Sequence, residues 1–279
     1  SIHSSSLPSS FSVDGMEEGS NPSPLLNMDQ SQLDSLLQSL LSSDTQQRLS
    51  DGSLDQLPPE QQANLLLKIG QSSANEETRC SSLDRLSRLL SSILHSWCSN
   101  ELVPFTAQMI QFAFVDKNPK LRDKIDDVLV LLTKHSLELN SGVHASPMIT
   151  SFVHQCAAAS DSILQRSSIA IITGVPSLFG KVISDLRDVV EKCMLSTDLS
   201  IRLLALSSFF DLFSDKTLSA LTPLLPVAIQ ICGEFVTASE EIRSKTPSPI
   251  NRLTQLASKY PDPMRGHLKR VITLCGRVS

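Results

Sequence analysis

Histidine and cysteine are the side chains of this 279-residue sequence that most readily hold a metal ion or act as nucleophiles. Four histidines lie in its apolar stretches, at positions 95, 135, 144 and 154. His154 is two residues from Cys156, and two such positions on a helix point to different faces, so the pair cannot chelate one ion. The six cysteines are spread singly, which is typical of buried free thiols in a reducing compartment. We predict no metal site and no catalytic residues.

One segment superficially resembles a phosphate-binding loop. That loop requires G-x-x-x-x-G-K-[ST], because backbone amides bind the phosphates and the hydroxyl reaches magnesium. Here five residues separate Gly174 from Gly180, Val182 replaces the hydroxyl residue, and Pro176 removes an amide. We interpret Gly174 as the end of a helix. The sequence therefore predicts neither a cofactor nor a small-molecule substrate, and a protein that is not an enzyme.

The composition favours helices with aliphatic cores. Hydrophobic residues make up 41% of the chain, whereas aromatic residues make up only 4% and glycine occurs 10 times, which argues against a β-sandwich or barrel. No apolar run approaches the roughly 18 residues that a membrane span requires. Apolar periodicity predicts a nearly continuous series of helices with short connections. The expected helices cover 59–70, 76–98, 101–115, 119–138, 147–159, 162–174, 181–195, 199–213, 217–236, 248–259 and 262–277.

A short motif that starts with Asn, Asp or Ser and ends in arginine recurs five times. Its arginines stand at 79, 122, 166, 202 and 243, so the steps are 43, 44, 36 and 41 residues. The first residue of the motif suits a helix N-cap, and an amphipathic helix precedes each copy, so the unit is a helical hairpin. Such hairpins stack into a solenoid because one alone cannot bury both faces. The alternative is an irregular helical bundle in which the spacing is accidental.

The pattern resembles the HEAT-repeat family, close kin of the armadillo repeats. Its second-helix signature, Asp-x-x-Val-Arg-x-x-Ala, is matched best by Asp198, Ile201, Arg202 and Ala205. The resemblance covers roughly 58–245 and implies an all-α fold, a right-handed α-solenoid of helical hairpins. In that family the acidic residue and the arginine commonly form a hydrogen-bond ladder between adjacent second helices. The ladder implied here uses Asn75, Arg79, Asn118, Arg122, Asp161, Arg166, Asp198 and Arg202.

Four segments follow from this reading. Residues 1–28 are rich in serine and proline and are predicted to be disordered. Residues 29–42 form a leucine-striped helix, 43–57 a polar linker, and 58–279 the solenoid with a basic C-terminal cap. The striped helix either caps the first repeat, which we favour, or docks on a partner. Its leucines are Leu33, Leu36, Leu37, Leu40 and Leu41.

The C-terminal end is basic. Residues 243–279 carry eight Lys or Arg against one acidic residue, a net charge of +7, whereas the whole chain carries −5. The last predicted helix places four apolar side chains on the face that closes the solenoid, namely Leu268, Val271, Ile272 and Cys275. Three basic residues near it are candidates for an acidic partner or for nucleic-acid phosphate, namely Arg265, Lys269 and Arg270. Aromatic residues for base stacking are nearly absent, which disfavours the nucleic-acid interpretation.

These features predict a non-catalytic protein–protein interaction scaffold, with a partner lying along a concave surface of second helices. Because the chain begins with Ser1, we expect part of a larger subunit of an intracellular multiprotein complex, in the nucleus or cytoplasm. The alternatives are a nucleic-acid-associated factor that uses the basic end, and an adaptor whose leucine helix is the ligand. Three Ser/Thr-Pro pairs are predicted phosphorylation sites, namely Ser23, Thr246 and Ser248.

Overall fold

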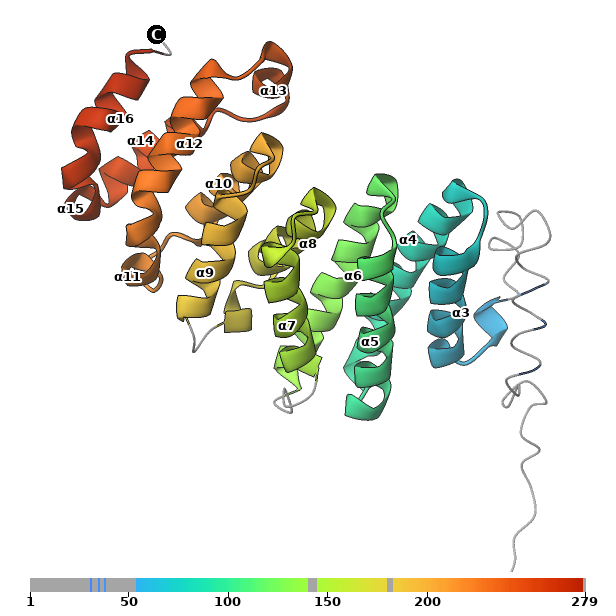
Figure 1. Ribbon diagram of the computed structural model, residues 1–279. Helices are drawn as coiled ribbons and strands as arrows, with labels where there is room; N and C mark the ends of the chain where they lie inside the picture. Colours follow the sequence, from blue (N-terminus) through green and yellow to red (C-terminus); the bar gives the residue numbers. More distant parts are fainter. Residues whose placement is uncertain are drawn as a thin grey trace, which may run out of the picture.

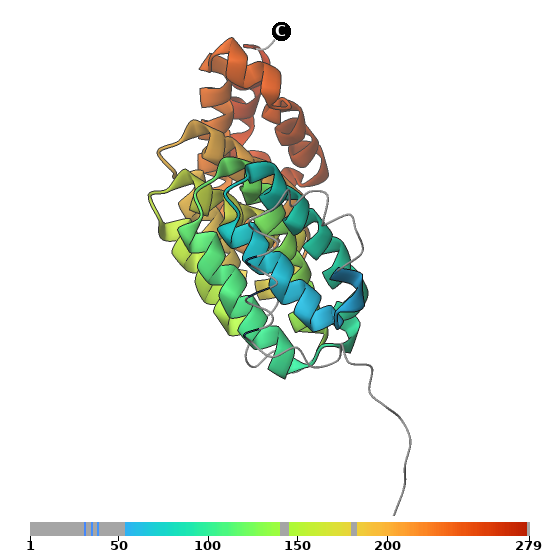
Figure 2. The same ribbon diagram turned by 90° about the vertical axis from the view of Figure 1, so that its right-hand side faces the viewer.

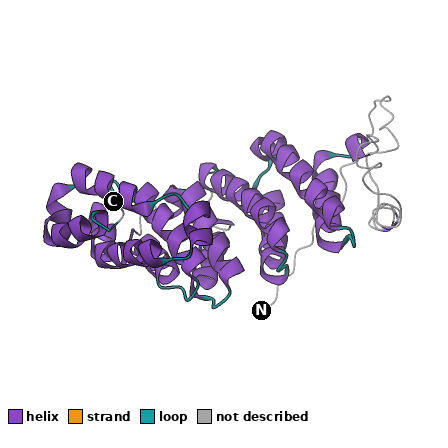
Figure 3. Cartoon of the chain, turned by 90° about the horizontal axis from the view of Figure 1, so that it is seen from above, coloured by secondary structure: helices purple, strands orange, loops and turns teal. Residues whose placement is uncertain are grey.

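The computed structural model describes residues 54–139, 145–179 and 183–277, together with the single positions 31, 35 and 38. Throughout these ranges the regular structure is helical, with no strand (Figure 3). The predicted disordered segment and the five leucines of the predicted striped helix lie outside the described residues. The end of the predicted linker lies inside them and corrects that prediction, because Leu54 and Leu57 are buried against the first hairpin.

Four helical hairpins form the first and larger part of the described chain. Each pairs a first helix with an antiparallel second helix, and the two pack on one another. The pairs are α3 (Pro59–Ser72) with α4 (Glu76–Ile93), α5 (Ser99–Val115) with α6 (Pro119–Glu138), α7 (Ala145–Ala158) with α8 (Ser162–Gly174), and α9 (Ile183–Met194) with α10 (Leu199–Leu212).

The C-terminal part is built from shorter helices. They are α11 (Leu218–Leu221), α12 (Leu225–Thr237), α13 (Glu240–Lys245), α14 (Pro249–Lys259), α15 (Pro261–Met264) and α16 (Leu268–Cys275). Two long helices predicted here, over 217–236 and 262–277, are each divided by a 3-10 turn. Pro223 lies in the first turn and Gly266 in the second, and neither residue favours a continuous α-helix.

The hairpins stack side by side into two layers (Figures 1 and 2). First helices contact first helices in the order α3, α5, α7, α9, α12 and α16, while second helices contact one another in the order α4, α6, α8, α10 and α14. Each hairpin therefore touches mainly its neighbours, as in a solenoid. The prediction of an all-α, right-handed α-solenoid is confirmed, and the irregular bundle is wrong.

The predicted capping residues begin the second helices. Four of them accept hydrogen bonds from backbone N–H groups one turn into their own helix, which satisfies amides that otherwise lack a partner. These residues are Asn75, Asn118, Asp161 and Asp198. The first turn of each second helix, including the arginine of the motif, is thereby fixed at the same end of every hairpin.

Close approach between second helices explains one glycine. Gly174 is the last residue of α8, and a Cβ added there would lie 2.9 Å from Cγ1 of Val130 on α6. That separation is shorter than two carbon atoms allow, so a side chain at 174 would push α8 away from α6. Gly174 does end the helix, as predicted, but the contact with Val130 gives the glycine a packing role as well.

Candidate functional site

Four of the five motif arginines lie in the first four hairpins, and each of them contacts a neighbouring repeat. Arg79 on α4 forms an ion pair with Asp116, just before α6, and Arg122 on α6 donates to Oγ of Ser167 on α8 at 3.0 Å. Arg166 and Arg202 also reach out of their own hairpins. Their acceptors are Asp123 on α6, at 2.6 Å, and Glu234 on α12, at 2.7 Å.

The predicted ladder partners are not the ones that these arginines bind. The Asn and Asp side chains at 75, 118, 161 and 198 each point one oxygen into the first turn of their own helix, because a capping residue lies directly over those amides. Two of them also contact a neighbouring repeat: Oδ2 of Asp161 pairs with Lys117 at 2.7 Å, and Nδ2 of Asn118 donates to Glu76 at 2.7 Å. The arginine lies one turn further on and reaches other acceptors. Two of the arginines, Arg122 and Arg166, thus connect adjacent second helices, as the resemblance implied, but through Ser167 and Asp123. Arg79 pairs with the α5–α6 connection and Arg202 with the first helix α12.

Ion pairs between second helices form a ladder that the sequence analysis missed, and this ladder includes the Arg166–Asp123 pair described above. Each pair joins a carboxylate in the body of one second helix to a cation in the body of the next. We call these three pairs the second-helix ladder: Asp84–Lys124 at 2.5 Å, Asp123–Arg166 at 2.6 Å and Asp211–Arg252 at 2.6 Å. The spacings of 40, 43 and 41 residues equal one repeat, so a search for acid–base pairs one repeat apart would have found them.

Between α8 and α10 the ladder is uncharged. Oγ of Ser208 and Oγ1 of Thr173 lie 2.7 Å apart at the corresponding step. A hydroxyl pair there keeps a polar link between the two helices without adding charge. The second helices from α4 to α14 are therefore joined by a polar contact at every step. We call the side of the solenoid that these helices form the second-helix face.

A buried polar cluster lies beneath this face, between α6 and α8. Arg122 is 1% exposed and donates to the backbone oxygens of Ala113 and Asp116 as well as to Ser167. Asp126, one turn further along α6, is 3% exposed, and neither of its carboxylate oxygens has a hydrogen-bond partner. Burial raises the pKa of Asp126 to about 7, although Ser167 and Arg122 oppose the rise.

A polar groove opens on the second-helix face between α4 and α6. Its volume is about 410 Å³. Its walls carry two charges without an ion-pair partner in the described part of the chain, Arg88 on α4 and Asp127 on α6, beside the ladder pair Asp84–Lys124. Burial and the nearby Asp123 carboxylate raise the pKa of Asp127. The groove therefore presents both signs of charge and hydroxyl groups to a ligand, which suits a peptide backbone with polar side chains better than an apolar molecule.

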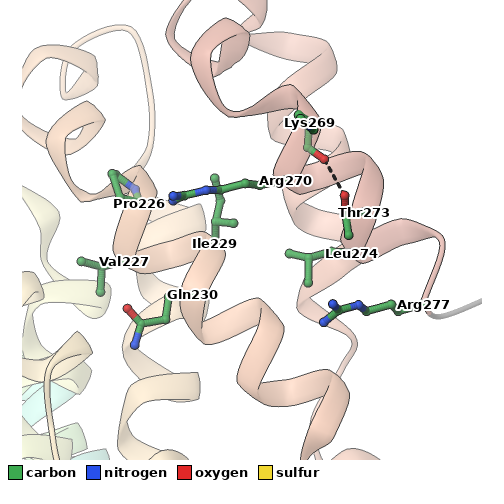
Figure 4. A pocket seen from close by; sticks show the side chains of 9 residues that line it. All are labelled: Pro226, Val227, Ile229, Gln230, Lys269, Arg270, Thr273, Leu274 and Arg277. Carbon is green, nitrogen blue, oxygen red and sulfur yellow. Dashed lines mark hydrogen bonds between the residues drawn. The ribbon is translucent and has the colours of Figure 1, made fainter.

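A second groove lies at the C-terminal end, between α12 and α16, and we call it the α12/α16 groove (Figure 4). Its volume is about 540 Å³. Lys269 and Arg270 line it from α16 and Arg277 from the turn that follows, and Arg270 extends across toward Pro226 of α12. Two of the three predicted basic residues thus share a groove. The third, Arg265, lies outside it and pairs with Asp262 at 2.8 Å.

The apolar face predicted for the last helix is partly wrong. Val271 is buried there, but Leu268 is 42% exposed and Ile272 is 70% exposed. Leu274, which was not predicted, takes their place in the core and forms part of the floor of the α12/α16 groove. The helix begins only at Leu268, after the 3-10 turn, and this shorter helix presents 271 and 274 rather than 268 and 272 to α12 and α14.

Three phosphorylation sites were predicted, and the structure places two of them. Thr246 is half-buried after α13, and Oγ of Ser248 is buried with no hydrogen-bond partner, so a kinase would need the turn before α14 to open. Ser23 lies outside the described residues, as do Leu33, Leu36, Leu37, Leu40 and Leu41. Modification of these sites remains a prediction.

The histidines and cysteines of the described part do not assemble. No group of three His, Cys, Asp or Glu side chains is close enough there to hold a metal ion. Burial raises the pKa of the thiols of Cys156 and Cys232 to about 12 and that of Cys193 to about 11, which keeps them protonated at neutral pH. Within the described part these three thiols are structural core residues.

One described stretch, Leu218–Thr237, is long and apolar enough to span a membrane by length and composition alone. The sequence analysis predicted one helix over 217–236 and no membrane span. In the structure Pro223 and Pro226 interrupt it, and its larger side chains, such as Leu225, are buried in the common core. We therefore interpret it as a core helix of the solenoid.

Comparisons with known proteins agree with this architecture. Residues 117–274, more than half of the chain, match a family model described as IPO5-like, TPR repeats. No curated protein sequence gives a significant match. Crystal structures of Kap121p do match. The TM-score is 0.68 at 15% identity for Kap121p and for Kap121p bound to Ste12p, and 0.66 at 16% for the karyopherin Kap121p bound to the SUMO protease Ulp1p.

The matches cover a much larger share of this chain than of the Kap121p chains. The alignments cover 87–88% of this chain but only 24% of the Kap121p chains, so the chain spans about a quarter of the length of its structural neighbours. At this sequence identity the likeness shows a shared fold. Both comparisons confirm the prediction of a HEAT/armadillo-type helical repeat protein.

Proposed function

Because the chain belongs to the family described as IPO5-like, TPR repeats, we propose that it is a scaffold that binds a segment of a partner protein on its second-helix face. The proposal includes no catalytic step. The site residues would be the side chains that line the groove between α4 and α6, chiefly Arg88 and Asp127. The remainder of the second-helix face would extend the contact toward α14.

The α4/α6 groove is the observation that carries this proposal. Arg88 and Asp127 are exposed and have no ion-pair partner among the residues that the structure describes, although the charges beside them are paired. Unpaired charges in a groove cost little to expose to water and gain when a ligand supplies the opposite charge. Two charges of opposite sign on facing walls also select the direction and register of a bound segment.

The second-helix ladder supports the proposal by holding the groove walls in place. Lys124 of α6 binds Asp84 of α4 directly beside the groove, and Ser82 of α4 donates from beneath to the backbone oxygen of Leu66 on α3. Walls fixed in this way lose little entropy when a ligand binds, which favours affinity. A binding surface that is joined at every repeat is typical of solenoid proteins.

The structural neighbours supply independent support. Kap121p has been crystallised bound to Ste12p, Pho4p, Nup53p and Ulp1p, all of them protein partners. Since karyopherins act in transport between cytoplasm and nucleus, we propose a location in one or both of these compartments and a protein ligand of the transported or transport-associated class. We also propose that partner binding takes place within a larger assembly.

The test is a charge exchange that leaves the net charge unchanged. The chain carrying R88E and D127K is compared with the wild type and with a control carrying E60K and K192E, which makes the same exchange at exposed positions on the first helices α3 and α9. Each immobilised protein is incubated with a cell lysate, cross-linked, and analysed by mass spectrometry of the cross-linked peptides.

We expect the wild type and the control to retain the same protein, with cross-links in α4 and α6. The R88E/D127K variant should lose at least about tenfold of that signal, as expected for reversal of two interface charges. Retention of the signal by this variant, or cross-links confined to the first helices, would contradict the proposal. Thermal unfolding of all three proteins verifies that the exchange leaves the fold intact.

A further inference from the structure

The α12/α16 groove holds the main unpaired positive charge of the basic C-terminal end. Of the eight basic residues in 243–279, three have carboxylate partners in the structure, namely Lys245, Arg252 and Arg265. Lys269, Arg270 and Arg277 have none among the described residues, and all three are exposed and line one groove. Arg243 and Lys259 also have no carboxylate partner among the described residues, but they do not line this groove. Folding therefore brings three of the five unneutralised cations together in one groove.

The floor of this groove is apolar. Ile229 and Leu274 are buried beneath it, and Val227 lies half-buried at its α12 side. Gln230 and Thr273 are the uncharged polar side chains of the lining, and Oγ1 of Thr273 already donates to the backbone oxygen of Lys269. An apolar surface between three positive charges is thus exposed to water in this groove. A bound ion alone would not cover that surface.

We propose that the α12/α16 groove binds an acidic segment of a partner protein that also carries an apolar side chain. The carboxylates would pair with Lys269, Arg270 and Arg277, and the apolar side chain would cover Val227 and Leu274. Charge complementarity requires a negatively charged ligand, and the apolar floor of the groove requires that the ligand also carry an apolar side chain. A volume of about 540 Å³ accommodates several side chains, which is the size of a short peptide segment.

A protein segment fits these observations better than a nucleic acid. A nucleic-acid site combines a basic track along the backbone with aromatic side chains that stack on bases. The lining of the α12/α16 groove contains no aromatic residue. Outside the groove, α13 begins with the exposed Glu240 and Glu241, which interrupt a basic track. Phosphates would also leave the apolar floor uncovered.

This second site does not depend on the proposed function. The α4/α6 groove and the α12/α16 groove lie toward opposite ends of the row of helices in Figure 1, and the second is formed by first-layer helices. The two could bind different partners or two segments of one partner. Loss of either site leaves the residues of the other unchanged, so the two proposals fail separately.

The experiment measures binding of a synthetic probe by fluorescence anisotropy. The probe is a labelled peptide in which glutamates flank two leucines. One comparison peptide has glutamine in place of every glutamate, and another has serine in place of both leucines. The protein variants are K269E/R270E and, as a matched control with the same change in net charge, K245E/R265E, in which both cations already have carboxylate partners outside the groove.

We expect the wild type and K245E/R265E to bind the probe alike and K269E/R270E to bind it at least about tenfold more weakly. Both comparison peptides should bind more weakly than the probe, and added salt should weaken the contribution of the glutamates but not that of the leucines. V227S should reduce affinity for the probe several-fold while leaving the serine peptide unaffected. Arg88 and Asp127 variants should bind the probe as the wild type does.

Three outcomes would overturn the proposal. The first is equal loss of affinity in K269E/R270E and K245E/R265E, which would mean that net charge alone attracts the probe. The second is equal affinity for the leucine and serine peptides, which would leave the apolar floor without a role. The third is tighter binding of a single-stranded DNA oligonucleotide or of vesicles with anionic lipid than of the probe, with the same loss in K269E/R270E.

Discussion

The second-helix ladder and the α12/α16 groove use the same types of charged side chain in opposite ways. In the ladder each cation meets a carboxylate one repeat away, as Lys124 meets Asp84 at 2.5 Å. In the groove Lys269, Arg270 and Arg277 lie together without such a partner in the described structure. A paired charge fixes how two helices lie together, whereas a charge left unpaired on the surface remains available to a ligand.

A second contrast lies within the repeat motif itself. Arg122 is the fourth residue of α6 and Arg166 is the fifth residue of α8, so the two side chains leave their helices in different directions. Arg122 is buried among backbone oxygens, whereas Arg166 is exposed beside Asp123. An exposed pair is screened by water and contributes little to stability, whereas a buried group depends fully on its partners. Burial, rather than the motif, decides which arginine holds the solenoid together.

The largest effect should therefore come from removing the buried arginine. Arg122→Met keeps most of the side-chain volume but leaves three acceptors without this donor and removes one of the two cations near Asp126. We expect unfolding to become easier by about 3–5 kcal/mol. Arg166→Met, the matched change in the next repeat, should cost less than about 1 kcal/mol. Urea denaturation followed by circular dichroism measures the free energy of unfolding of both variants. Equal losses would contradict the expected difference between the buried and the exposed arginine.

Asp126 should make stability depend on pH in the range below neutrality. Its pKa is raised from 3.8 to about 7 in the folded chain, so folding favours the protonated form. The stability that this preference contributes is complete below 3.8 and is lost as the pH rises toward about 7. The total is of the order of several kcal/mol.

The matched variant for this prediction is Asp126→Asn, which cannot ionise. Relative to the wild type, we expect it to gain stability steadily as the pH is raised from below 3.8 to about 7, and no further gain above that range. Urea midpoints of both proteins across this pH range give the difference directly. A constant difference at every pH would show that folding does not change the pKa of Asp126.

A third contrast is in the packing around two glycines, Gly174 at the contact of α8 with α6 and Gly266 in the turn before α16. Gly174→Ala places a Cβ 2.9 Å from Cγ1 of Val130, and we expect a loss of about 1–3 kcal/mol as α8 moves from α6. Gly266→Ala, in the turn before α16, meets no atom within 4 Å and should be neutral or slightly stabilising. Melting temperatures of the two variants test this expected difference in stability. An unchanged melting temperature for Gly174→Ala would show that α6 and α8 can separate enough to accept the Cβ without loss of stability.

The stacking of the hairpins was predictable from the sequence because it depends on features that recur once per repeat. The capping residues at 118, 161 and 198, together with the apolar faces that follow them, fix where each second helix starts and what it buries. The helix boundaries in the first four hairpins follow from these signals to within a few residues. Apolar periodicity does not register the prolines and the glycine that divide the C-terminal helices, so those boundaries were wrong.

The contacts of the candidate sites were harder to predict, for a physical reason. A capping position and a ladder position both call for Asp or Asn, and only the geometry shows that Asp198 satisfies its own helix while Asp211 reaches Arg252. The α12/α16 groove was found only in part. Lys269 and Arg270 were recognised by charge, but the floor depends on which face of α16 turns inward, and one 3-10 turn changes that face.

The two smallest expected effects test the contrast between paired and unpaired charges most sharply. Loss of a paired charge should lower the stability of the fold, whereas loss of an unpaired charge should raise it slightly. A double-mutant cycle on Asp123 and Arg166, with Asn and Met as replacements, should give a coupling of about 0.2–1 kcal/mol in favour of the pair. Lys269→Met removes a cation that stands beside two others, so we expect a change within about 0.5 kcal/mol, on the stabilising side, as like-charge repulsion is relieved. Denaturation at low and high salt separates the two, since salt should weaken the coupling in the ladder and reduce the gain from Lys269→Met. A loss of stability in Lys269→Met comparable to the ladder coupling would mean that Lys269 already has a structural partner, and the groove would then have one fewer charge to offer a ligand.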